Sequence, residues 1–472
     1  MLFNSLGFAF FLPAVFALYW LLDGNVRRQN RLLLVASYVF YGWWDWRYLS
    51  LIAGCSLANF LAGKFIHRAR SRGVRRLWLS AACVVSLGVL GVFKYFDFFA
   101  ASFAQLFSCI GIHWSPLVLD LALPVGISFF TFQALSYTID IALGNLKPAD
   151  DWVEFFAFIA FFPQLVAGPI ERASNLLPQF QRARCLDFEK ATHGVCLILF
   201  GLFKKMVVAD TLSQYVDKAW DNPMFYSSVT CLIAAVFFAF QIYCDFSGYS
   251  DVARGVARLF GFELMLNFNS PYLAQSFSDF WRRWHISLSS WFKDYVYIPL
   301  GGNRVSFAKM LRNIWIVFLL SGLWHGASWA FVVWGALHAL YLSLEAVKRR
   351  IAGPSVRTGL LFRVLAVATV DIGVVFAWIF FRAGTIHDAV VYLQALFGCR
   401  WQTSMMALCA GLGPMQFGFC VVAAALFVAS AFCPRDCGFK TVRARFAFSL
   451  LCIAAIVFIG MPSGGEFIYF KF

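Results

Sequence analysis

The sequence predicts an all-α polytopic membrane protein with about 11 to 12 membrane-spanning or re-entrant helices, judged by the length that crosses a hydrocarbon core. Three observations support this fold class. The 472 residues are 61% apolar and only 13% charged, whereas soluble domains carry roughly a quarter charged residues. Several uncharged runs exceed the roughly 18 residues of a membrane span. Lysine and arginine gather in short clusters between these runs, which is typical of cytoplasmic loops.

The expected spans follow the apolar runs in chain order. The first run has no basic segment before it and no small-residue cleavage site, so it is expected to be retained as a span. Its arginines follow it, which predicts that Met1 lies outside the cytoplasm. Segments 32–46 and 48–63 are short and closely joined, which is typical of a hairpin. The expected spans are residues 6–22, 32–46, 48–63, 77–93, 117–143, 152–171, 191–209, 228–244, 313–344, 364–381, 415–432 and 446–461.

The net charge of +15 comes from basic clusters at 25–31, 64–76, 348–363 and 435–445. Because these clusters alternate with apolar runs, they indicate membrane topology, and the expected partner is membrane lipid rather than nucleic acid. The 13 cysteines are scattered, without a CxxC pair, and most lie in apolar runs. Buried free cysteine behaves as a small hydrophobic residue, so no disulfide framework is expected.

The uncharged run at 313–344 is too long for one ordinary span. Its 32 residues would form a helix of about 48 Å, against a hydrocarbon core of about 30 Å. Gly322 and Gly326 flank His325 in the middle of the run, and glycine weakens a helix interior. We therefore expect a break, or at least a close backbone approach, near His325.

The region 245–312 contains no membrane-length apolar run, yet it is too aromatic for an exposed loop. From Trp281 to Tyr295, aromatic and apolar residues recur at helical spacing, with His285 on the same face. Residues 276–279 supply a helix start resembling a capping box, and residues 298–303 end the helix. The pattern predicts one amphipathic helix at a membrane interface or in a re-entrant position.

His325 and His285 are the candidate functional residues, because ionisable groups at membrane depth are costly. The competing interpretation is a neutral, hydrogen-bonded structural histidine, which we favour for His193 and His338. No metal site is expected, since the further ligands that zinc needs are absent nearby. No GxSxG motif is present either. The simplest chemistry is a neutral histidine acting as general base toward a hydroxyl, which then attacks an activated acyl group directly.

Several stretches resemble the membrane-bound O-acyltransferase (MBOAT) family, in its bacterial branch of alginate O-acetyltransferases. This branch also contains enzymes of peptidoglycan and cellulose O-acetylation and the teichoic-acid D-alanyl transferase. The long stretch through WRRWHISL is highly specific. The matching stretches lie at 123–141, 161–180, 243–262, 266–304, 320–340 and 466–472.

The resemblance implies one membrane domain over 1–472, with N-terminal helices at 1–115, a core at 116–345 and C-terminal helices at 346–472. It implies tilted helices around a central funnel. It also makes His325 the catalytic residue and His285 its polar partner. Candidate residues for binding the substrate or the anionic acyl donor are Arg282, Arg283, Lys293, Arg304, Trp324 and Asp279. The competing interpretations are that the cations only anchor the interfacial helix and that Asp279 is structural.

The expected function is transfer of an acyl group, most simply acetyl, to an extracytoplasmic polysaccharide from a bacterial cytoplasmic (inner) membrane. The resemblance implies a thioester donor, acetyl-CoA or an acyl carrier protein, as substrate, no permanently bound cofactor, and an extracytoplasmic acetyltransferase as partner. Alginate-type acetylation ranks ahead of peptidoglycan, then cellulose, with D-alanyl transfer last. The rivals are a transporter or flippase, which predicts repeated halves that the sequence lacks, and a scaffold of a polysaccharide-modification complex.

Overall fold

The computed structural model describes residues 1–22, 24–353, 359–401, 404–431, 437–439, 441–461 and 467–468. These residues form helices and irregular segments, with no β-strand among them, so the predicted all-α fold is confirmed. The chain divides into two compact units. Unit 1 comprises Met1–Val195 and Ala253–Met265, and unit 2 comprises Cys196–Val252 and Leu266–Phe472. The expectation of one domain with three parts stays a prediction.

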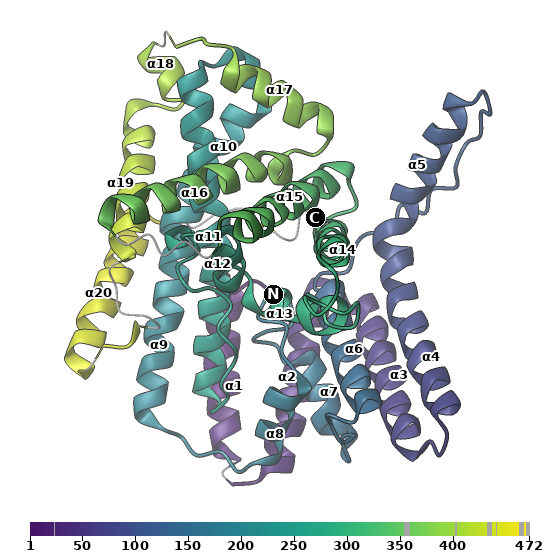
Figure 1. Cartoon of the computed structure of the whole chain (residues 1–472). Coiled ribbons are helices and arrows are strands. Elements are labelled where there is room, and N and C mark those ends of the chain that lie inside the picture. Colours follow the sequence, from purple (N-terminus) through teal and green to yellow (C-terminus); the bar gives the residue numbers. More distant parts are fainter. Residues whose placement is uncertain are drawn as a thin grey trace. The chain divides into compact units, whose positions relative to one another are not determined.

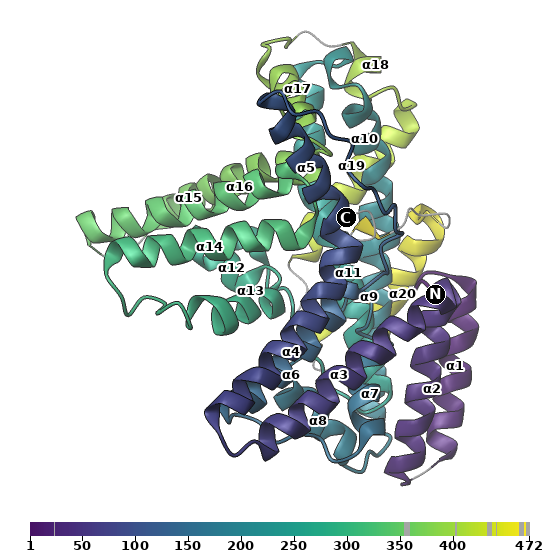
Figure 2. The same ribbon diagram turned by 90° about the vertical axis from the view of Figure 1, so that its right-hand side faces the viewer.

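In unit 1, α3, α4 and α6 pack side by side (Figures 1 and 2). Gly63 of α3 allows the close approach, because a Cβ there would lie 2.8 Å from the Tyr137 ring of α6. The helices wholly in this unit are α1 (Leu6–Leu21), α2 (Val26–Asp45), α3 (Leu49–Arg68), α4 (Arg72–Leu90), α5 (Phe96–Cys109), α6 (Ile127–Leu143), α7 (Trp152–Ala160) and α8 (Ala173–Gln181).

Unit 2 contains the long neighbouring helices α14, α15 and α16 (Figure 2). Two helices, α9 (Phe188–Phe203) and α11 (Ser228–Leu259), contribute residues to both units. The helices wholly in unit 2 are α10 (Asp210–Asp221), α12 (Phe277–Arg283), α13 (Ile286–Phe292), α14 (Phe307–His325), α15 (Trp329–Ala352), α16 (Leu360–Arg382), α17 (Ile386–Phe397), α18 (Met405–Leu408), α19 (Pro414–Ser430) and α20 (Val442–Ile459).

Seven helical stretches among the described residues are long and apolar enough to cross a membrane, which bears out the prediction of a multi-pass protein. Helices occur in all of the expected spans, and the first, α1, covers Leu6–Leu21 where 6–22 was expected. Segments 32–46 and 48–63 fall in α2 and α3, which are joined by the 3₁₀ turn Trp46–Tyr48. The seven stretches are Val26–Arg68, Arg72–Cys109, Ser228–Leu259, Phe307–His325, Trp329–Ala352, Leu360–Arg382 and Val442–Ile459.

Two expected spans are shorter than predicted. The helix in 117–143 begins only at Ile127, after Gly126 in the left-handed region at φ 76°. In 152–171, α7 ends at Ala160, and residues 161–171 are buried without regular helix. Irregular backbone at such depth needs internal partners. The side chain of Ser37 supplies one, accepting a hydrogen bond from the Phe162 N–H at 3.1 Å.

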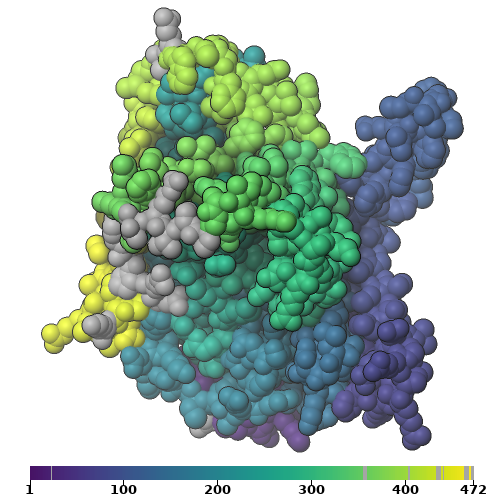
Figure 3. Space-filling model, viewed as in Figure 1, coloured from purple at the N-terminus to yellow at the C-terminus, as the bar shows by residue number. Residues whose placement is uncertain are grey.

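Helix α5 was not predicted from the sequence. It continues α4 through the π-helical segment Gly91–Tyr95. It buries none of its residues, and in the space-filling view it projects beyond α4 as a separate arm (Figure 3). An arm that packs against so little of the chain leaves a weak burial pattern in the sequence, because amphipathic periodicity records which face a helix buries.

A buried ion network crosses unit 2. Lys205 Nζ lies 2.8 Å from Asp210 Oδ1 and 2.7 Å from Asp245 Oδ1. Asp245 also accepts a hydrogen bond from the backbone N–H of Ile468 at 2.6 Å. The adjacent Lys204 pairs with Asp251. These charges connect the π-helical segment Lys204–Ala209, helix α11 and the described part of the C-terminal end.

Candidate active site

The run 313–344 is broken at the predicted place. Helix α14 ends at His325, the next residue Gly326 is extended, and α15 begins at Trp329. Ser328 caps α15, since its Oγ accepts a hydrogen bond from the Ala330 N–H at 3.3 Å and donates one to the Gly384 carbonyl at 2.9 Å. His325 thus occupies a helix end inside the protein, with 3% of its surface exposed.

Glycines let α14 and α15 approach closely beside this break. A Cβ on Gly322 would lie 2.3 Å from the Phe331 carbonyl oxygen, and one on Gly335 would lie 2.2 Å from the Phe318 carbonyl oxygen. Both distances are far below van der Waals contact, so only glycine fits without movement of the backbone. The close approach predicted near His325 is therefore confirmed.

His285 lies between α12 and α13, and the predicted single amphipathic helix is wrong at this point. Its start is confirmed, because Ser276 Oγ accepts the Asp279 N–H at 3.1 Å. Helix α12 ends at Arg283, however, and His285 takes φ 43° and ψ 55°. A non-glycine residue in the left-handed region costs about 1–3 kcal/mol, and such strain clusters at functional sites. The turn carries the His285 side chain into the interior, where it is fully buried.

Asn267 holds this turn, and the sequence did not single it out. Its Oδ1 accepts hydrogen bonds from the Ser287 N–H at 3.2 Å and from Ser287 Oγ at 2.9 Å. The Ile286 N–H donates to its backbone carbonyl at 2.9 Å. His285 Nδ1 lies 3.1 Å from the same Oδ1. Because a carboxamide oxygen can only accept, Nδ1 carries the proton and the lone pair of the neutral ring is on Nε2.

Aromatic side chains surround the two imidazoles. The ring centroid of His285 lies 4.7 Å from Phe246 and 5.9 Å from Trp324. That of His325 lies 5.0 Å from Trp324 and 4.9 Å from Trp334. The two histidine rings are 6.4 Å apart, too far for a direct hydrogen bond between them. This apolar enclosure favours neutral imidazoles, which is the form a general base requires.

Two further histidines are hydrogen-bonded, as predicted for structural residues. His338 Nδ1 accepts the indole N–H of Trp281 at 3.3 Å, one aromatic layer from His325. In unit 1, His193 Nδ1 lies 2.5 Å from Arg258 Nη1. Among the residues that the structure describes, no group of three or more His, Cys, Asp or Glu is placed to hold a metal ion.

Of the other predicted site residues, only Trp324 lies in the histidine cluster. Arg283 is paired with Asp279, with 3.0 Å between Nε and Oδ1, so both stabilise α12. This supports the structural interpretation of Asp279. Three predicted donor-binding cations are exposed side chains: Arg282, Lys293 and Arg304.

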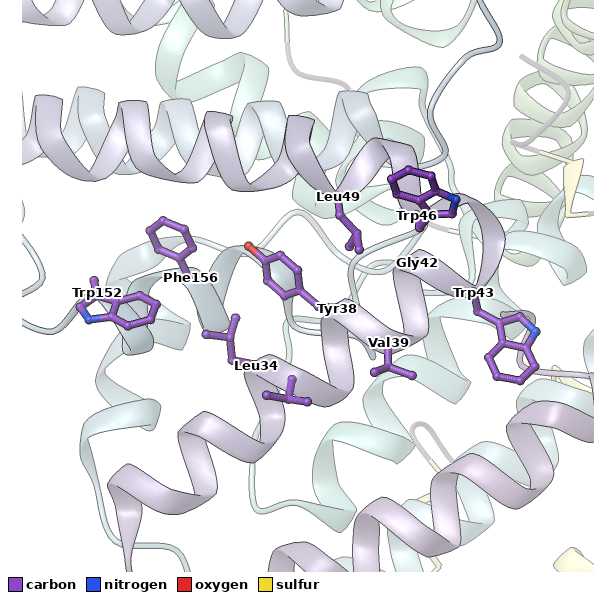
Figure 4. A pocket seen from close by; sticks show the side chains of 10 residues that line it. Leu34, Tyr38, Val39, Gly42, Trp43, Trp46, Leu49, Trp152 and Phe156 are labelled. Atoms are coloured by element: carbon purple, nitrogen blue, oxygen red, sulfur yellow. The ribbon is translucent and has the colours of Figure 1, made fainter.

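A separate pocket of about 670 Å³ lies in unit 1, between α2, α3 and α7 (Figure 4). Trp43 and Trp46 lie at one end and Trp152 at the other. Among the residues that the structure describes, its lining contains no histidine, carboxylate or cation, so these residues offer no acid–base group for acyl transfer. The lining residues are Leu34, Val35, Tyr38, Val39, Gly42, Trp43, Trp46, Leu49, Trp152 and Phe156.

The fold has several helices that can cross a membrane, and it encloses two neighbouring imidazoles. These features define a class of protein: an integral membrane protein equipped for acid–base chemistry. Residues 150–382 match the profile of the membrane-bound O-acyltransferase family. A probable alginate O-acetylase of Pseudomonas aeruginosa is 41% identical over 430 residues, covering 90% of this chain and 80% of the relative. The chain belongs to the MBOAT family and is an O-acyltransferase.

Two other relatives show the breadth of the family. The peptidoglycan O-acetyltransferase of Helicobacter pylori is 35% identical over 428 residues, covering 84% of this chain and 80% of the relative. The teichoic acid D-alanyltransferase of Bacillus subtilis is 27% identical over 230 residues, covering 46% of this chain and 58% of the relative. The resemblance seen in the sequence motifs is therefore confirmed.

Proposed function

We propose that the protein O-acetylates an extracytoplasmic polysaccharide of the alginate type, from a position in a bacterial cytoplasmic membrane. The observation that carries this proposal is the 41% identity to a probable alginate O-acetylase over most of both chains. The peptidoglycan relative at 35% makes a cell-wall acceptor the second candidate. The donor is a cytoplasmic acetyl thioester, carried by coenzyme A or by an acyl carrier protein, and a separate extracytoplasmic acetyltransferase completes the modification of the polymer.

His325 acts as the general base. One of its ring nitrogens takes the proton of the accepting hydroxyl while the oxygen attacks the thioester carbonyl carbon. The carbon–sulfur bond then breaks, the thiolate leaves, and the proton passes from the imidazolium to the sulfur. No acyl-enzyme is needed. The burial of His325 in an aromatic enclosure supports this role, because a neutral imidazole is available to accept a proton.

His285 assists electrostatically, through the lone pair of its neutral ring. Donation of a hydrogen bond to the developing oxyanion would need a proton on Nε2. Because Asn267 Oδ1 faces Nδ1, a proton on Nε2 requires a charged ring, and full burial disfavours that charge. A lone pair near His325 instead stabilises the imidazolium that forms there when the hydroxyl loses its proton.

The test is base-labile acetate released separately from exopolysaccharide and from peptidoglycan. Cells would carry the native chain, His325→Ala, His338→Ala or no chain, with membrane abundance matched. A general base contributes roughly 10²–10⁴ in rate, so His325→Ala should fall to the level without the chain. His338→Ala is the matched control, a fully buried histidine one layer away.

Native-level acetate with His325→Ala, together with loss of acetate when the chain is absent, would make His325 structural and favour the scaffold or transporter alternative. Acetate lost from peptidoglycan but retained on exopolysaccharide would move the acceptor to the cell wall.

A further inference from the structure

A second pocket, of about 520 Å³, lies in unit 2 among the start of α12, the second half of α15 and the first half of α16. This volume is within the usual range for small-molecule sites. Its lining mixes charged and apolar side chains. The lining residues are Gln275, Ser276, Phe277, Tyr341, Leu344, Glu345, Lys348, Phe362, Arg363, Leu365, Ala366, Thr369 and Val370.

The charged part of this pocket has positive character. Lys348 and Arg363 are exposed side chains of its lining, at the end of α15 and the start of α16. The single carboxylate among the described lining residues is Glu345, which is already engaged. It accepts hydrogen bonds from the Ser278 N–H at 3.0 Å and from Ser278 Oγ at 2.8 Å, and it pairs with Arg349. The cations are therefore available to an anion from outside the chain.

Apart from Gln275, Ser276 and Thr369, the rest of the lining is apolar, and most of it comes from α15 and α16, which can span a membrane. Phe277 stacks on Tyr341 with ring centroids 4.5 Å apart. Leu344, Phe362 and Leu365 are 58%, 47% and 53% exposed. In a membrane protein such side chains meet hydrocarbon. A soluble anion gains nothing from them, whereas an amphiphile with an anionic head satisfies both parts of the pocket.

We propose that this pocket binds an anionic phospholipid. The phosphate group lies between Lys348 and Arg363, and an acyl chain runs along Leu344, Phe362 and Leu365. Basic pockets between membrane helices recognise anionic headgroups in this way, and Lys/Arg clusters of this kind mark the cytoplasmic leaflet. The site contains none of the histidines assigned to catalysis, so the proposal does not depend on the acceptor or donor of acyl transfer.

The test uses native mass spectrometry of the full chain in detergent, with phosphatidylglycerol or phosphatidylcholine of identical acyl chains as probe. Lys348→Gln with Arg363→Gln removes the headgroup contacts. Ala366→Phe fills the pocket and leaves the charges. Arg75→Gln with Arg76→Gln is the control, because it removes the same charge from exposed residues of another basic cluster. Thermal unfolding identifies any variant that misfolds. If Ala366→Phe misfolds, Lys348→Gln with Arg363→Gln still tests the site.

The native chain and the control should retain one phosphatidylglycerol in preference to phosphatidylcholine. Lys348→Gln with Arg363→Gln should weaken that binding roughly thirtyfold, because two basic residues near a membrane surface contribute about 1 kcal/mol each. Ala366→Phe should also weaken it, because the new ring occupies the space of the acyl chain. Equal weakening in the control would mean diffuse attraction and overturn the proposal, as would equal binding of the two lipids. Displacement by glycerol 3-phosphate would make this a site for soluble anions, and displacement by acetyl-CoA would make it a donor site. Either result would overturn the lipid assignment.

Discussion

His285 adopts a left-handed backbone conformation that its sequence neighbours do not demand, and Asn267 compensates for it. One carboxamide oxygen receives the His285 Nδ1–H, the Ser287 N–H and the Ser287 hydroxyl, while the backbone carbonyl of Asn267 receives the Ile286 N–H. Together these bonds fix both the turn and the tautomer of the ring. The tautomer of this candidate catalytic histidine is thus set by a residue 18 positions earlier in the sequence.

The first prediction concerns this residue. Asn267→Ala should lower kcat for acetyl transfer roughly 10- to 100-fold, the range found when orienting partners of metal-bound histidines are removed. It leaves Nδ1 without its acceptor and allows the other tautomer. Unsatisfied buried donors should also cost about 1–3 kcal/mol of stability. The measurement is turnover per folded molecule in proteoliposomes, with the folded fraction taken from size-exclusion chromatography.

Asn313→Ala is the matched control for this variant. Asn313 is equally buried in the same unit. Its amide donates to the backbone carbonyls of Leu300 and Gly302 at 3.1 and 3.2 Å, and its Oδ1 accepts from Arg312 rather than from a histidine. It should lose stability with little change in kcat. Equal kcat losses in the two variants would show that Asn267 acts through folding alone.

At the scale of elements, the pairing of α14 with α15 depends on glycine. Gly335→Ala should markedly lower the midpoint of thermal unfolding, because its Cβ would lie 2.2 Å from the Phe318 carbonyl oxygen. Overpacking of this kind costs typically 1–3 kcal/mol. Gly418→Ala is the control in the interior of α19, where a Cβ meets nothing within 4 Å. It should be neutral or stabilising, since alanine favours helix over glycine. Similar midpoints for the two variants would contradict the packing argument.

The two helix breaks show how far the sequence could predict the site. The break at His325 followed from physical limits, because the 313–344 run is longer than a membrane and carries glycine at its centre. The break at His285 gave no such signal. Aromatic residues continue at helical spacing through Trp284, so periodicity predicts one helix, and no glycine marks the turn. The deciding interaction comes from Asn267, and a contact between distant residues leaves no local pattern.

The end of the expected span 152–171 was predicted wrongly for a related reason. Hydropathy indicates which residues are buried, and residues 161–171 are as buried as those of a helix. What distinguishes it is the supply of internal hydrogen-bond partners, such as Ser37 for the Phe162 N–H. Composition establishes that this segment lies inside the protein, whereas its backbone conformation depends on tertiary contacts.

At the largest scale, the buried ions of unit 2 connect segments more than 200 residues apart, since Asp245 bonds both Lys205 and the Ile468 N–H. Lys205→Met should be more destabilising than Asp245→Asn. The first change leaves Asp210 and Asp245, 5% and 3% exposed, without the cation that they share. Asp245→Asn keeps the ion pair between Lys205 and Asp210, and the new carboxamide still offers an oxygen to the Ile468 N–H. Breaking a buried pair costs about 3–5 kcal/mol.

Thermal unfolding in detergent would give the order of the two midpoints. A midpoint for Asp245→Asn at or below that of Lys205→Met would show that Lys205 is not the shared cation of this network.

Membrane topology is the prediction that concerns the whole chain. The basic clusters at 25–31 and 64–76 are expected in the cytoplasm. One helix, α1, precedes the first cluster, so Met1 is expected outside. Helices α2 and α3 lie between the two clusters, so the chain can cross the membrane outward through α2 and return to the cytoplasm through α3. A compartment-sensitive reporter at residue 1 should therefore give an extracytoplasmic signal, and the same reporter after residue 70 a cytoplasmic one. A cytoplasmic signal at residue 1 would show that α1 has the opposite orientation. An extracytoplasmic signal after residue 70 would show that α2 and α3 together cross the membrane only once.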